Sequence, residues 1–417
     1  MRFAKENTTL TPIETQYLIN EIVKAREAVD ARNKRGEESF CPICKLPKHS
    51  SRYCEHCMRV KLKKEVWTSG NPKIDAFLRK HQDESPVPYC IIEWIEFRDL
   101  KNVEFLAEGG YGKVYSATWT RGWIIDWDMK ENNFIREPRN VALKIFNNNN
   151  FSKNEIFQEA NWNQIFTRDR TVRNFVVLGL GFTKNEEGEY MIVFDFCEGG
   201  DLRAYLQKHY KNMSWKDKIG LAWNISVDLY RISETGSIHG DLHPGNILLL
   251  RNGGSWVISD LGTCESVDAQ KEQMEVKGVP PYIAPELLEG YRKTKESDIY
   301  AFGIIMWEIS AGCAPLGDRS IDRVRISLGL RPPIVPGTPK IYADLMQNCW
   351  AANPRDRISA KDAAKTLQVL MRNMMENNFV DEYPVEENQS CKSQESDSST
   401  HRTSKVFRRQ LNAVLDT

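Results

Sequence analysis

One stretch, residues 239–262, constrains this chain more than any other. It reads HGDLHPGNILLLRNGGSWVISDLG, so Asn246 follows Asp241 by five residues and Asp260 stands beyond an apolar run. The turn at residues 252–254 favours a hairpin that would bring the two acids back together. Phosphoryl transfer from ATP needs three polar side chains of these kinds. One carboxylate accepts a hydroxyl proton, and an amide and a second carboxylate hold a divalent cation. The stretch therefore predicts a phosphotransfer site.

Two motifs upstream fit the same chemistry. Residues 106–115, LAEGGYGKVY, predict two strands around a glycine turn whose backbone N–H groups can approach phosphate oxygens. Lys144 ends the apolar motif VALK, where an unpaired ammonium would be costly. The next predicted helix offers Glu155 and Glu159 as partners. The long connection between these motifs, residues 118–140, carries three tryptophans and predicts a hairpin extension.

Motifs in the second half of the chain extend the pattern. Residues 191–202 read MIVFDFCEGGDL, and residues 284–286 read APE. Asp298 lies in SDIYAFGIIMWEI. Arg357 lies in CWAANPRDRIS and is placed to pair with Glu286. All these motifs follow the order found in protein kinases, which the chain resembles over residues 99–375, most closely in the tyrosine-kinase-like branch. The resemblance extends to the expanded kinase family of arbuscular mycorrhizal fungi. It rests on three segments that precede the glycine turn: the Cys-pair motif described below, WTSGNPKIDAFL and EWIEF.

The resemblance implies an α+β fold, the bilobal protein kinase fold. A small β-rich N-lobe would span residues 99–196, and a large helical C-lobe would span residues 197–375. Residues 191–202 would form the strand and hinge between the lobes, where extended backbone binds adenine. Phe194 would guard the inner part of the nucleotide pocket.

The resemblance also implies a role for each polar residue of the site. Asp241 would accept the substrate hydroxyl proton, Asn246 and Asp260 would hold Mg²⁺ or Mn²⁺, and Lys144, fixed by Glu159, would bind the α- and β-phosphates. Glu159 is favoured over the other candidate because its spacing from Lys144 suits the kinase ion pair. The implied contacts to ATP are Leu106, Ala107, Glu108, Gly109, Gly110, Tyr111, Gly112, Val114, Ala142, Lys144, Phe194, Asp195, Phe196 and Cys197.

Several positions depart from the family pattern. Ala107 replaces the first loop glycine, at little cost because later glycines keep the turn open. Gly240 replaces the arginine that receives a phosphorylated activation-loop residue in many kinases. His243 replaces the lysine that reaches the transferring phosphate in Ser/Thr kinases, and Val279 replaces the threonine that accompanies it. The changes remove the usual Ser/Thr signature without installing a tyrosine-kinase one.

The leading interpretation is an ATP-dependent protein kinase directed to Ser or Thr and acting in signalling. Tyrosine or dual specificity stays open as a weaker alternative. A second hypothesis is a pseudokinase scaffold that binds partners through the fold and the N-terminal module. A third is a small-molecule phosphotransferase, because HGDLHPGN also resembles aminoglycoside-type kinases. The APE segment, Asp298 and Arg357 count against that third hypothesis.

Four cysteines cluster near the N-terminus in the pattern C-x2-C-x9-C-x2-C. They are Cys41, Cys44, Cys54 and Cys57, and two such pairs can present four thiolates tetrahedrally to a structural Zn²⁺. Histidines 49 and 56 could replace a thiolate, and four unligated thiols are the plain alternative. We expect a Cys-pair module over residues 41–65, which could bind a partner protein. A helical segment would precede it within residues 1–40, and a linker, residues 66–98, would follow.

Composition narrows the setting. Lys plus Arg and Asp plus Glu both number 57, so nothing favours a nucleic-acid or membrane surface. The kinase resemblance implies a protein substrate as the partner. No apolar run reaches the length of a membrane helix, and the first residues lack a secretory signal. Six of the ten cysteines are scattered, which indicates a reducing, cytoplasmic setting. Residues 376–417 form a polar, Ser-rich segment that we expect to be disordered.

Overall fold

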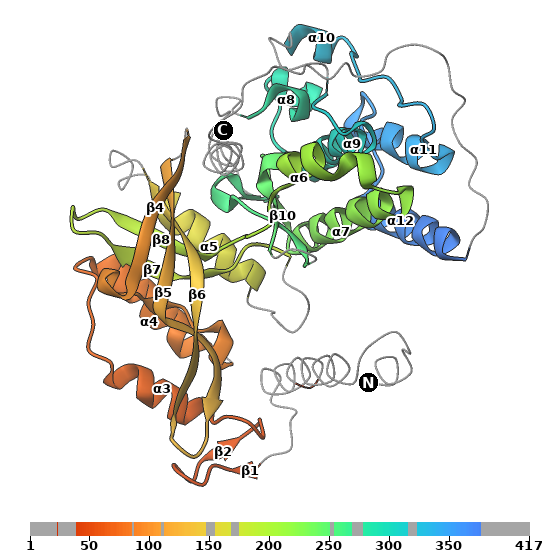
Figure 1. Ribbon diagram of the computed structural model, residues 1–417. Helices are drawn as coiled ribbons and strands as arrows, with labels where there is room; N and C mark the ends of the chain where they lie inside the picture. The colour runs from red at the N-terminus through yellow and green to blue at the C-terminus, as the bar shows by residue number, and fades with distance from the viewer. Residues whose placement is uncertain are drawn as a thin grey trace.

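The computed structural model describes residue 23 and residues 39–85, 87–109, 112–146, 155–167, 175–250, 254–268, 278–315 and 323–376. Within these residues a sheet-rich lobe is followed by a helical lobe (Figure 1). This arrangement confirms the expected α+β, bilobal kinase fold. The Ser-rich tail, the two turn residues Gly110 and Tyr111, and the predicted N-terminal helix apart from Val23 lie outside the described residues.

The N-lobe is built on a six-stranded sheet in the order β3-β7-β8-β6-β5-β4. Every neighbouring pair is antiparallel except β3 and β7, which are parallel. The strands are β3 (Glu93–Trp94), β4 (Leu100–Gly109), β5 (Gly112–Asp128), β6 (Asn133–Phe146), β7 (Gly179–Lys184) and β8 (Tyr190–Asp195). One helix, α5 (Glu155–Thr167), follows β6 and packs beside the sheet (Figure 1).

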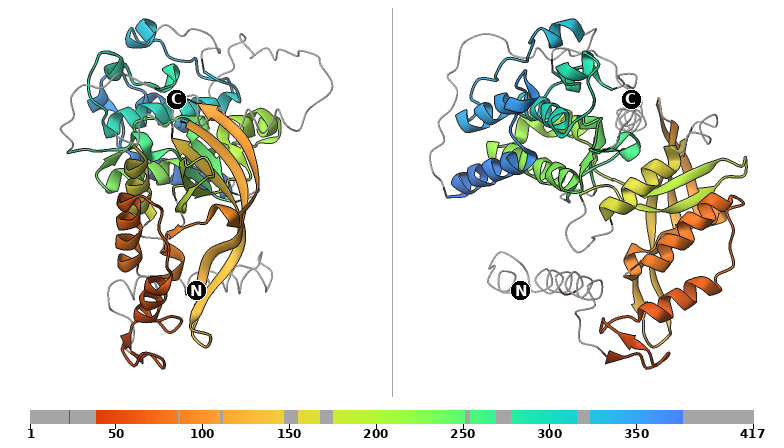
Figure 2. Two further views of the ribbon diagram at one scale, coloured as in Figure 1. Left: turned by 90° about the vertical axis from the view of Figure 1, so that its left-hand side faces the viewer. Right: turned by 180° about the vertical axis from the view of Figure 1, so that it is seen from behind.

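The β5–β6 hairpin extends far beyond the sheet, as the sequence predicted. The two strands pair from Gly112 and Phe146 to Asp128 and Asn133. Bulges interrupt the register between Trp119 and Trp123 and between Ile124 and Asp126. The buried indole of Trp119 belongs to the sheet core. Trp127, farther out, packs with Phe134 and the cysteine-rich N-terminal residues. The hairpin therefore joins the sheet to the N-terminal module (Figure 2).

The N-terminal segment folds onto the N-lobe. Its elements are β1 (Ser39–Phe40), β2 (Pro47–Lys48), α3 (Glu55–Lys64), α4 (Pro72–Glu84) and the 3₁₀ turn η1 (Pro88–Cys90). The Asn71 side chain accepts a hydrogen bond from Lys73 N–H and caps α4, which begins at a proline as expected for a first helical position. Buried Ile74 and Leu78 pack against Phe182 of the sheet. Residues 66–98, which we expected to connect the Cys-pair module to the kinase-like region, thus include α4 and pack on the sheet.

The C-lobe is helical around one deeply buried helix, α9. Every residue from Ser297 to Ser310 in α9 is buried, so this helix is enclosed on all sides. The described helices of this lobe are α6 (Leu202–His209), α7 (Trp215–Glu234), α8 (Pro285–Leu288), α9 (Lys295–Ala311), α10 (Arg323–Ser327), α11 (Lys340–Cys349) and α12 (Ala360–Met375). Capping boxes start α7 at Ser214 and α9 at Thr294.

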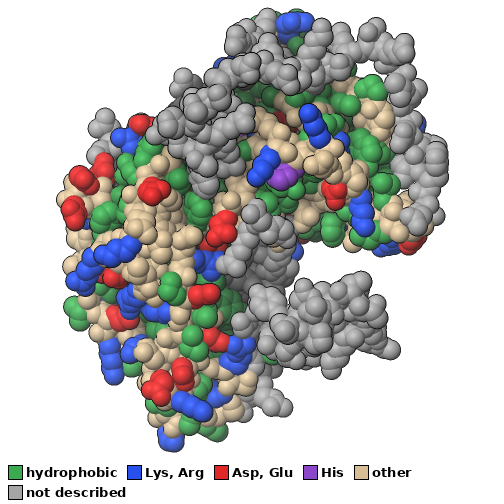
Figure 3. Space-filling model, in the orientation of Figure 1, with side chains coloured by type: hydrophobic (Ala, Val, Ile, Leu, Met, Phe, Trp, Pro, Cys, Tyr) green, Lys and Arg blue, Asp and Glu red, His purple; other side chains and the backbone are tan. Residues whose placement is uncertain are grey.

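Short strands at the lobe boundary carry the polar motifs. They are β9 (Gly200–Asp201), β10 (Ser237–Ile238), β11 (Ile247–Leu249), β12 (Trp256–Ile258) and β13 (Glu265–Ser266). The other described 3₁₀ turns of the chain are η2 (Phe97–Asp99), η4 (Tyr210–Asn212), η5 (Pro244–Asn246), η6 (Leu261–Thr263), η7 (Pro280–Tyr282) and η8 (Pro354–Asp356). Among the described helices, none combines the length and apolarity needed to cross a membrane. On the face drawn in Figure 3, basic and acidic side chains are interspersed.

Candidate active site

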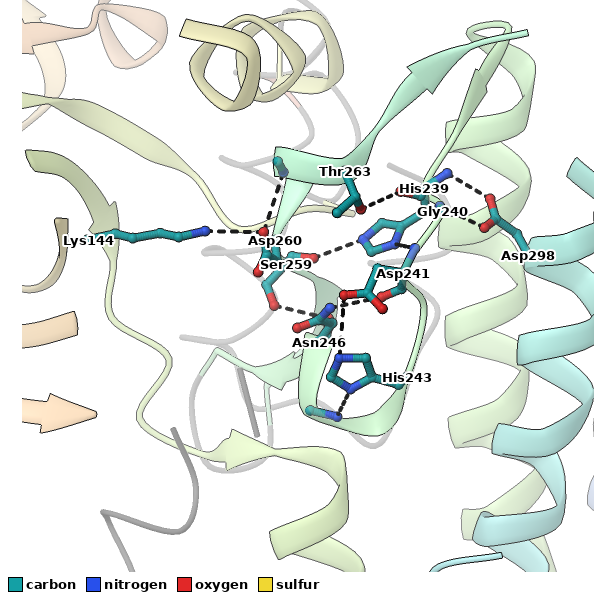
Figure 4. A network of polar contacts seen from close by, with 12 residues as sticks. Lys144, His239, Gly240, Asp241, His243, Asn246, Ser259, Asp260, Thr263 and Asp298 are labelled. Carbon is teal, nitrogen blue, oxygen red and sulfur yellow. Dashed lines mark hydrogen bonds and ion pairs between the residues drawn. The ribbon is translucent and has the colours of Figure 1, made fainter. Parts of the chain in front are cut away.

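The β11–β12 hairpin brings the three polar residues of the opening motif together. Ile247 pairs with Ile258, so Asn246 and Asp260 stand at the same end of the hairpin. Asn246 Nδ2 donates to the Asp241 carbonyl at 2.9 Å (Figure 4). The Asn246 carbonyl in turn accepts hydrogen bonds from the backbone and hydroxyl of Ser259, next to Asp260. The motif predicted from local spacing is therefore one compact loop cluster.

Asp298 of α9 holds the start of this loop. Its carboxylate accepts from His239 N–H at 2.7 Å and from Gly240 N–H at 2.9 Å. His239 Nε2 lies 2.9 Å from the Ser259 carbonyl, which ties the two arms of the site together (Figure 4). Burial raises the pKa of Asp298, while His239 and the two amide hydrogen bonds act in the opposite direction.

Lys144 of β6 reaches the cluster from the N-lobe. Its Nζ lies 2.8 Å from Glu159 Oε2 on α5 and 3.1 Å from Asp260 Oδ1. All three side chains are at least 93% buried. Burial alone lowers the pKa of Lys144, but Asp260 and Glu159 outweigh it and raise the pKa above its usual value. Glu159 is thus placed where we preferred it; the side chain of Glu155 lies outside the described part of α5.

Among the buried side-chain oxygens near the site that have no hydrogen bond within the described residues are Asn246 Oδ1 and Asp260 Oδ2. Asp260 adopts a left-handed backbone conformation, with φ of 56°, which is uncommon for a residue with a side chain. Strained backbone of this kind is retained where the surroundings fix it, often at functional sites. Two orphaned hard oxygens, one of them anionic, suit Mg²⁺ or Mn²⁺.

A cleft of about 730 Å³, including its open mouth, lies between the N-lobe sheet and the β11–β12 hairpin. Its lining is mainly apolar but includes Lys144, Glu159 and Asp260. Its remaining walls are Val114, Ala142, Val177, Phe194, Asp195, Phe196, Cys197, Gly200, Asp201, Leu248 and Ser259. A concave apolar pocket with a few converging polar groups is typical of a nucleotide or cofactor site.

Not every expected contact residue lines this cleft. Leu106 and Ala107 pack with Val114 above it. Glu108 forms an exposed ion pair with Lys113, at 3.8 Å, and does not line it. Gly109 and Gly112 pair at the end of β4 and β5.

Sequence reasoning missed five of the lining residues, Val177, Gly200, Asp201, Leu248 and Ser259. Three of them carried a signal. Gly200 and Asp201 belong to GGDL at the end of the quoted residues 191–202, and Leu248 stands two residues after Asn246. Asp201 caps α6 by accepting from Ala204 N–H at 2.9 Å, and burial raises its pKa to about 7.

The predicted hinge is fixed by an ion pair. Arg139 of β6 donates two hydrogen bonds to the Asp195 carboxylate, at 2.6 and 2.7 Å. Asp195 N–H donates to the Leu178 carbonyl at 2.8 Å. Burial raises the pKa of the Cys197 thiol, so this cysteine is an unreactive lining residue at neutral pH.

His243 occupies the position of the family's lysine as a neutral side chain. Burial, aided by Arg203, lowers its pKa to about 3. Its Nδ1 accepts from Gly245 N–H at 3.1 Å, so the remaining proton sits on Nε2. Nε2 lies 3.8 Å from Asp241 Oδ2. The histidine therefore offers a hydrogen-bond donor beside Asp241 and carries no positive charge.

The segment that follows the site is anchored to the C-lobe. Arg357 forms a two-point ion pair with Glu286, at 2.6 and 2.7 Å, as the APE resemblance predicted. Tyr282 hydrogen-bonds to Glu308 and accepts from Arg203 at 2.9 Å. Both pairs are largely buried, which fixes the wall beside Asp241.

A second cluster lies at the N-terminal module. The Sγ atoms of Cys41, Cys44, Cys54 and Cys57 all lie within 4.8 Å of one another. The Cys41–Cys57 and Cys44–Cys54 sulfur pairs are 3.7 and 3.6 Å apart, and all four cysteines are unbridged. Four sulfurs about 2.3 Å from a tetrahedral Zn²⁺ would lie about 3.8 Å from one another. The four thiols therefore fit Zn²⁺ without a histidine.

Comparison with known proteins agrees with this geometry. The chain is 28% identical over 294 residues to a probable serine/threonine-protein kinase, gdt4, of Dictyostelium discoideum, covering 68% of this chain and 16% of that protein. It is 29% identical over 276 residues to a probable LIM domain-containing serine/threonine-protein kinase of the same organism. This match covers 65% of this chain and 39% of that protein. It is 25% identical over 298 residues to human mitogen-activated protein kinase kinase kinase 7. This match covers 69% of this chain and 45% of that protein.

The chain thus spans less than half the length of each of these relatives. A family model described as protein tyrosine and serine/threonine kinase matches residues 100–367, which is more than half of the chain. The chain belongs to the protein tyrosine and serine/threonine kinase family.

Proposed function

We propose that the protein is an ATP-dependent protein kinase that transfers the γ-phosphoryl group to Ser or Thr hydroxyls in a signalling role. One observation carries the proposal. Lys144, from the N-lobe sheet, contacts both Glu159 of α5 and Asp260 of the C-lobe, beside Asn246. Protein kinases need the lysine–glutamate pair and the magnesium-binding aspartate in place together, and here they meet in one structure.

The proposed roles follow from this geometry. Asp241 accepts the proton of the acceptor hydroxyl, and its backbone carbonyl is tied to Asn246. Asn246 Oδ1 and Asp260 Oδ2 hold Mg²⁺, and Lys144, held by Glu159, binds the α- and β-phosphates. Bound Mg²⁺–ATP supplies the phosphoryl group and the positive charge that its transfer requires.

The nucleotide would occupy the cleft between the lobes. Its adenine would lie against the apolar walls near the Asp195–Cys197 backbone, with Phe194 closing the inner end. The turn from Gly109 to Gly112 joins β4 and β5 above the cleft, where backbone N–H groups would cover the phosphates. The Arg139–Asp195 ion pair keeps the hinge strand in register for this contact.

Specificity for Ser or Thr is supported by the names of the relatives. Those reported above are named as serine/threonine kinases or as a mitogen-activated protein kinase kinase kinase. Tyrosine or dual specificity stays open as the weaker alternative, because His243 and Val279 remove the usual Ser/Thr signature without installing a tyrosine-kinase one. We also place the chain in the tyrosine-kinase-like branch, near the expanded family of arbuscular mycorrhizal fungi.

A pseudokinase scaffold is the second candidate and is not favoured. Scaffolds of this fold usually lack one of the essential polar residues. Here Lys144, Glu159, Asp241, Asn246 and Asp260 are all present and mutually placed.

For the Cys-pair module, we propose one structural Zn²⁺ and a docking role for a partner protein. The four sulfurs have the mutual spacing of a tetrahedral site. One relative's name includes a LIM domain. We further propose a cytoplasmic location, since all nine described cysteines are unbridged.

The test is phosphate transfer from labelled ATP, with Mg²⁺, to a generic basic protein substrate. Wild type should label the substrate, and Asp260→Asn should abolish labelling because the magnesium ligand loses its charge. Asp268→Asn, a change at an exposed aspartate nearby, is the matched control and should behave as wild type. Equal labelling by wild type and Asp260→Asn would refute the proposal.

A further inference from the structure

Gly240 stands where many kinases have an arginine, and the space beside it is occupied by the side chain of Lys293. A Cβ atom placed on Gly240 would lie 2.7 Å from Cδ, 2.8 Å from Nζ and 3.1 Å from Cε of Lys293. These distances are shorter than van der Waals contact, so the lysine side chain fills the volume in which a side chain at position 240 would begin. The residue also has φ of +79°, a conformation that glycine adopts without strain.

Lys293 reaches this place from a distant part of the chain. It lies between α8 and the Thr294 cap of α9, more than fifty residues after Gly240 in sequence. Its side chain is half-buried, so its charge is less screened than that of a surface lysine. The catalytic loop therefore has a cation beside it, supplied by another segment.

Lys293 is linked to Asp298 through Gly240, because its ammonium lies beside the backbone whose amide donates to the Asp298 carboxylate. Asp298 is buried and binds the amides of His239 and Gly240, which fixes the start of the catalytic loop. Burial raises the pKa of Asp298, whereas His239, the two amide hydrogen bonds and, as the smallest influence, the charge of Lys293 favour the ionised carboxylate. An ionised carboxylate accepts both amide hydrogen bonds more strongly than a neutral acid does.

The segment between Asp260 and the APE motif offers few hydroxyl groups to which a regulatory phosphate could be attached. Residues 267–281 contain no Ser, Thr or Tyr. Tyr282 is buried against Glu308, and Thr263 donates its hydroxyl proton to the His239 carbonyl at 2.9 Å. A phosphate could still be placed on Ser266, which lies in β13. The sequence therefore removes most of the usual acceptor positions together with the arginine that would bind them.

We propose that Lys293 is a positioning residue for phosphoryl transfer. Its ammonium replaces the cation missing at position 240 and holds Asp298 and the catalytic loop without an activation-segment phosphate. The inference rests on the proposed kinase function and adds how its active arrangement is maintained. Lys293 touches no substrate in this account; it acts through Asp298 on the backbone that carries Asp241.

The test uses full-length protein treated with phosphatase and shown by mass spectrometry to carry no phosphate. Lys293→Met keeps the alkyl stem and removes the charge, and Lys293→Arg keeps a charge. Arg292→Met, at the neighbouring exposed position, is the matched control for loss of one positive charge. Steady-state kinetics give kcat and the KM for ATP, and hydrogen exchange reports on the amides of residues 239–246.

We expect dephosphorylated wild type to stay active. Lys293→Met should lower kcat about ten-fold with little change in the KM for ATP, since small displacements of a catalytic group cost this much or more. Its 239–246 amides should exchange faster, and Lys293→Arg should restore most of kcat. Arg292→Met should match wild type in both readouts.

Three results would overturn the inference: unchanged kcat in Lys293→Met, no rescue by Lys293→Arg, or loss of wild-type activity on dephosphorylation. If wild type transfers no phosphate before phosphatase treatment, the proposed function fails instead. Hydrogen exchange then still decides the role of Lys293, because faster exchange in Lys293→Met supports it and unchanged exchange refutes it.

Discussion

Phe77 of α4 packs edge-on against Phe157 of α5, with ring centroids 6.2 Å apart and ring planes at 64°. Phe77 also meets Phe182 of the sheet, with centroids 5.7 Å apart. The helix α4 precedes the residues matched by the kinase family, whereas α5 carries Glu159 of the site. A segment outside the family match therefore braces the helix that positions Lys144.

Replacing Phe77 by Ala should weaken both stability and catalysis. Loss of a half-buried ring should lower the free energy of unfolding by about 2 kcal/mol, less than for a fully buried phenylalanine. A looser α5 should also lower kcat/KM several-fold, because Glu159 holds Lys144 less firmly. Denaturant unfolding and steady-state kinetics measure the two effects.

Phe40→Ala provides the control for Phe77→Ala, since Phe40 belongs to the same N-terminal segment but is 70% exposed. It should change neither quantity appreciably. Similar effects of the two substitutions would show that α4 does not brace α5.

The cysteine module should contain one Zn²⁺ per chain. Cys44→Ser should lose the metal, because three thiolates and a hydroxyl bind Zn²⁺ more weakly than four thiolates. Trp127 packs against this module, so its fluorescence should change when a chelator removes the metal. Elemental analysis of purified protein gives the stoichiometry.

Cys90→Ala is the matched change at a buried cysteine of the same apolar cluster that is not one of the four. It should keep stoichiometric Zn²⁺. Protein that holds no metal after mild purification, or equal metal content in Cys44→Ser and wild type, would contradict the assignment.

His243 should make stability depend on pH in the acidic range. The unfolded chain binds a proton at this histidine near pH 6.5, whereas the folded chain does not until about pH 3. The unfolded state therefore binds more protons between these values, and the free energy of unfolding falls as pH falls, by at most about 1.4 kcal/mol per pH unit from this group.

His243→Asn should remove that contribution while keeping an acceptor for Gly245 N–H. Urea unfolding of both proteins at pH 6.5 and pH 5 makes the comparison, and carboxylates that titrate in this range cancel in the difference. A wild-type slope no steeper than that of the variant would show that His243 is protonated in the folded protein.

Local spacing explains what could be read from the sequence. Asp241, Asn246 and Asp260 are joined by one hairpin, so a short stretch of chain determines how they meet. Lys144 and Glu159 are only 15 residues apart on consecutive elements, and the family resemblance was enough to pair them. The tryptophan-rich connection was likewise recognisable as a hairpin because its apolar residues recur within a single pair of strands.

Contacts between distant segments were not readable. The packing of α4 on α5 depends on apolar faces more than seventy residues apart, and many other pairings satisfy the same pattern. The neutral state of His243 follows from its burial, which a motif does not encode. The sequence showed that Gly240 lacks the arginine, but only the fold shows Lys293 beside it.

The proposed mechanism is tested most directly by measuring phosphate transfer by wild type and by Asp241→Asn. The substrates are three peptides, one with a single Ser, one with a single Thr and one with a single Tyr. Wild type should phosphorylate the Ser or Thr peptide, and Asp241→Asn should lower kcat at least about a hundred-fold, as for loss of a general base. The variant should still bind Mg²⁺–ATP as wild type does, because Lys144, Asn246 and Asp260 remain. Undiminished kcat in Asp241→Asn, or phosphorylation of the Tyr peptide alone, would contradict the account.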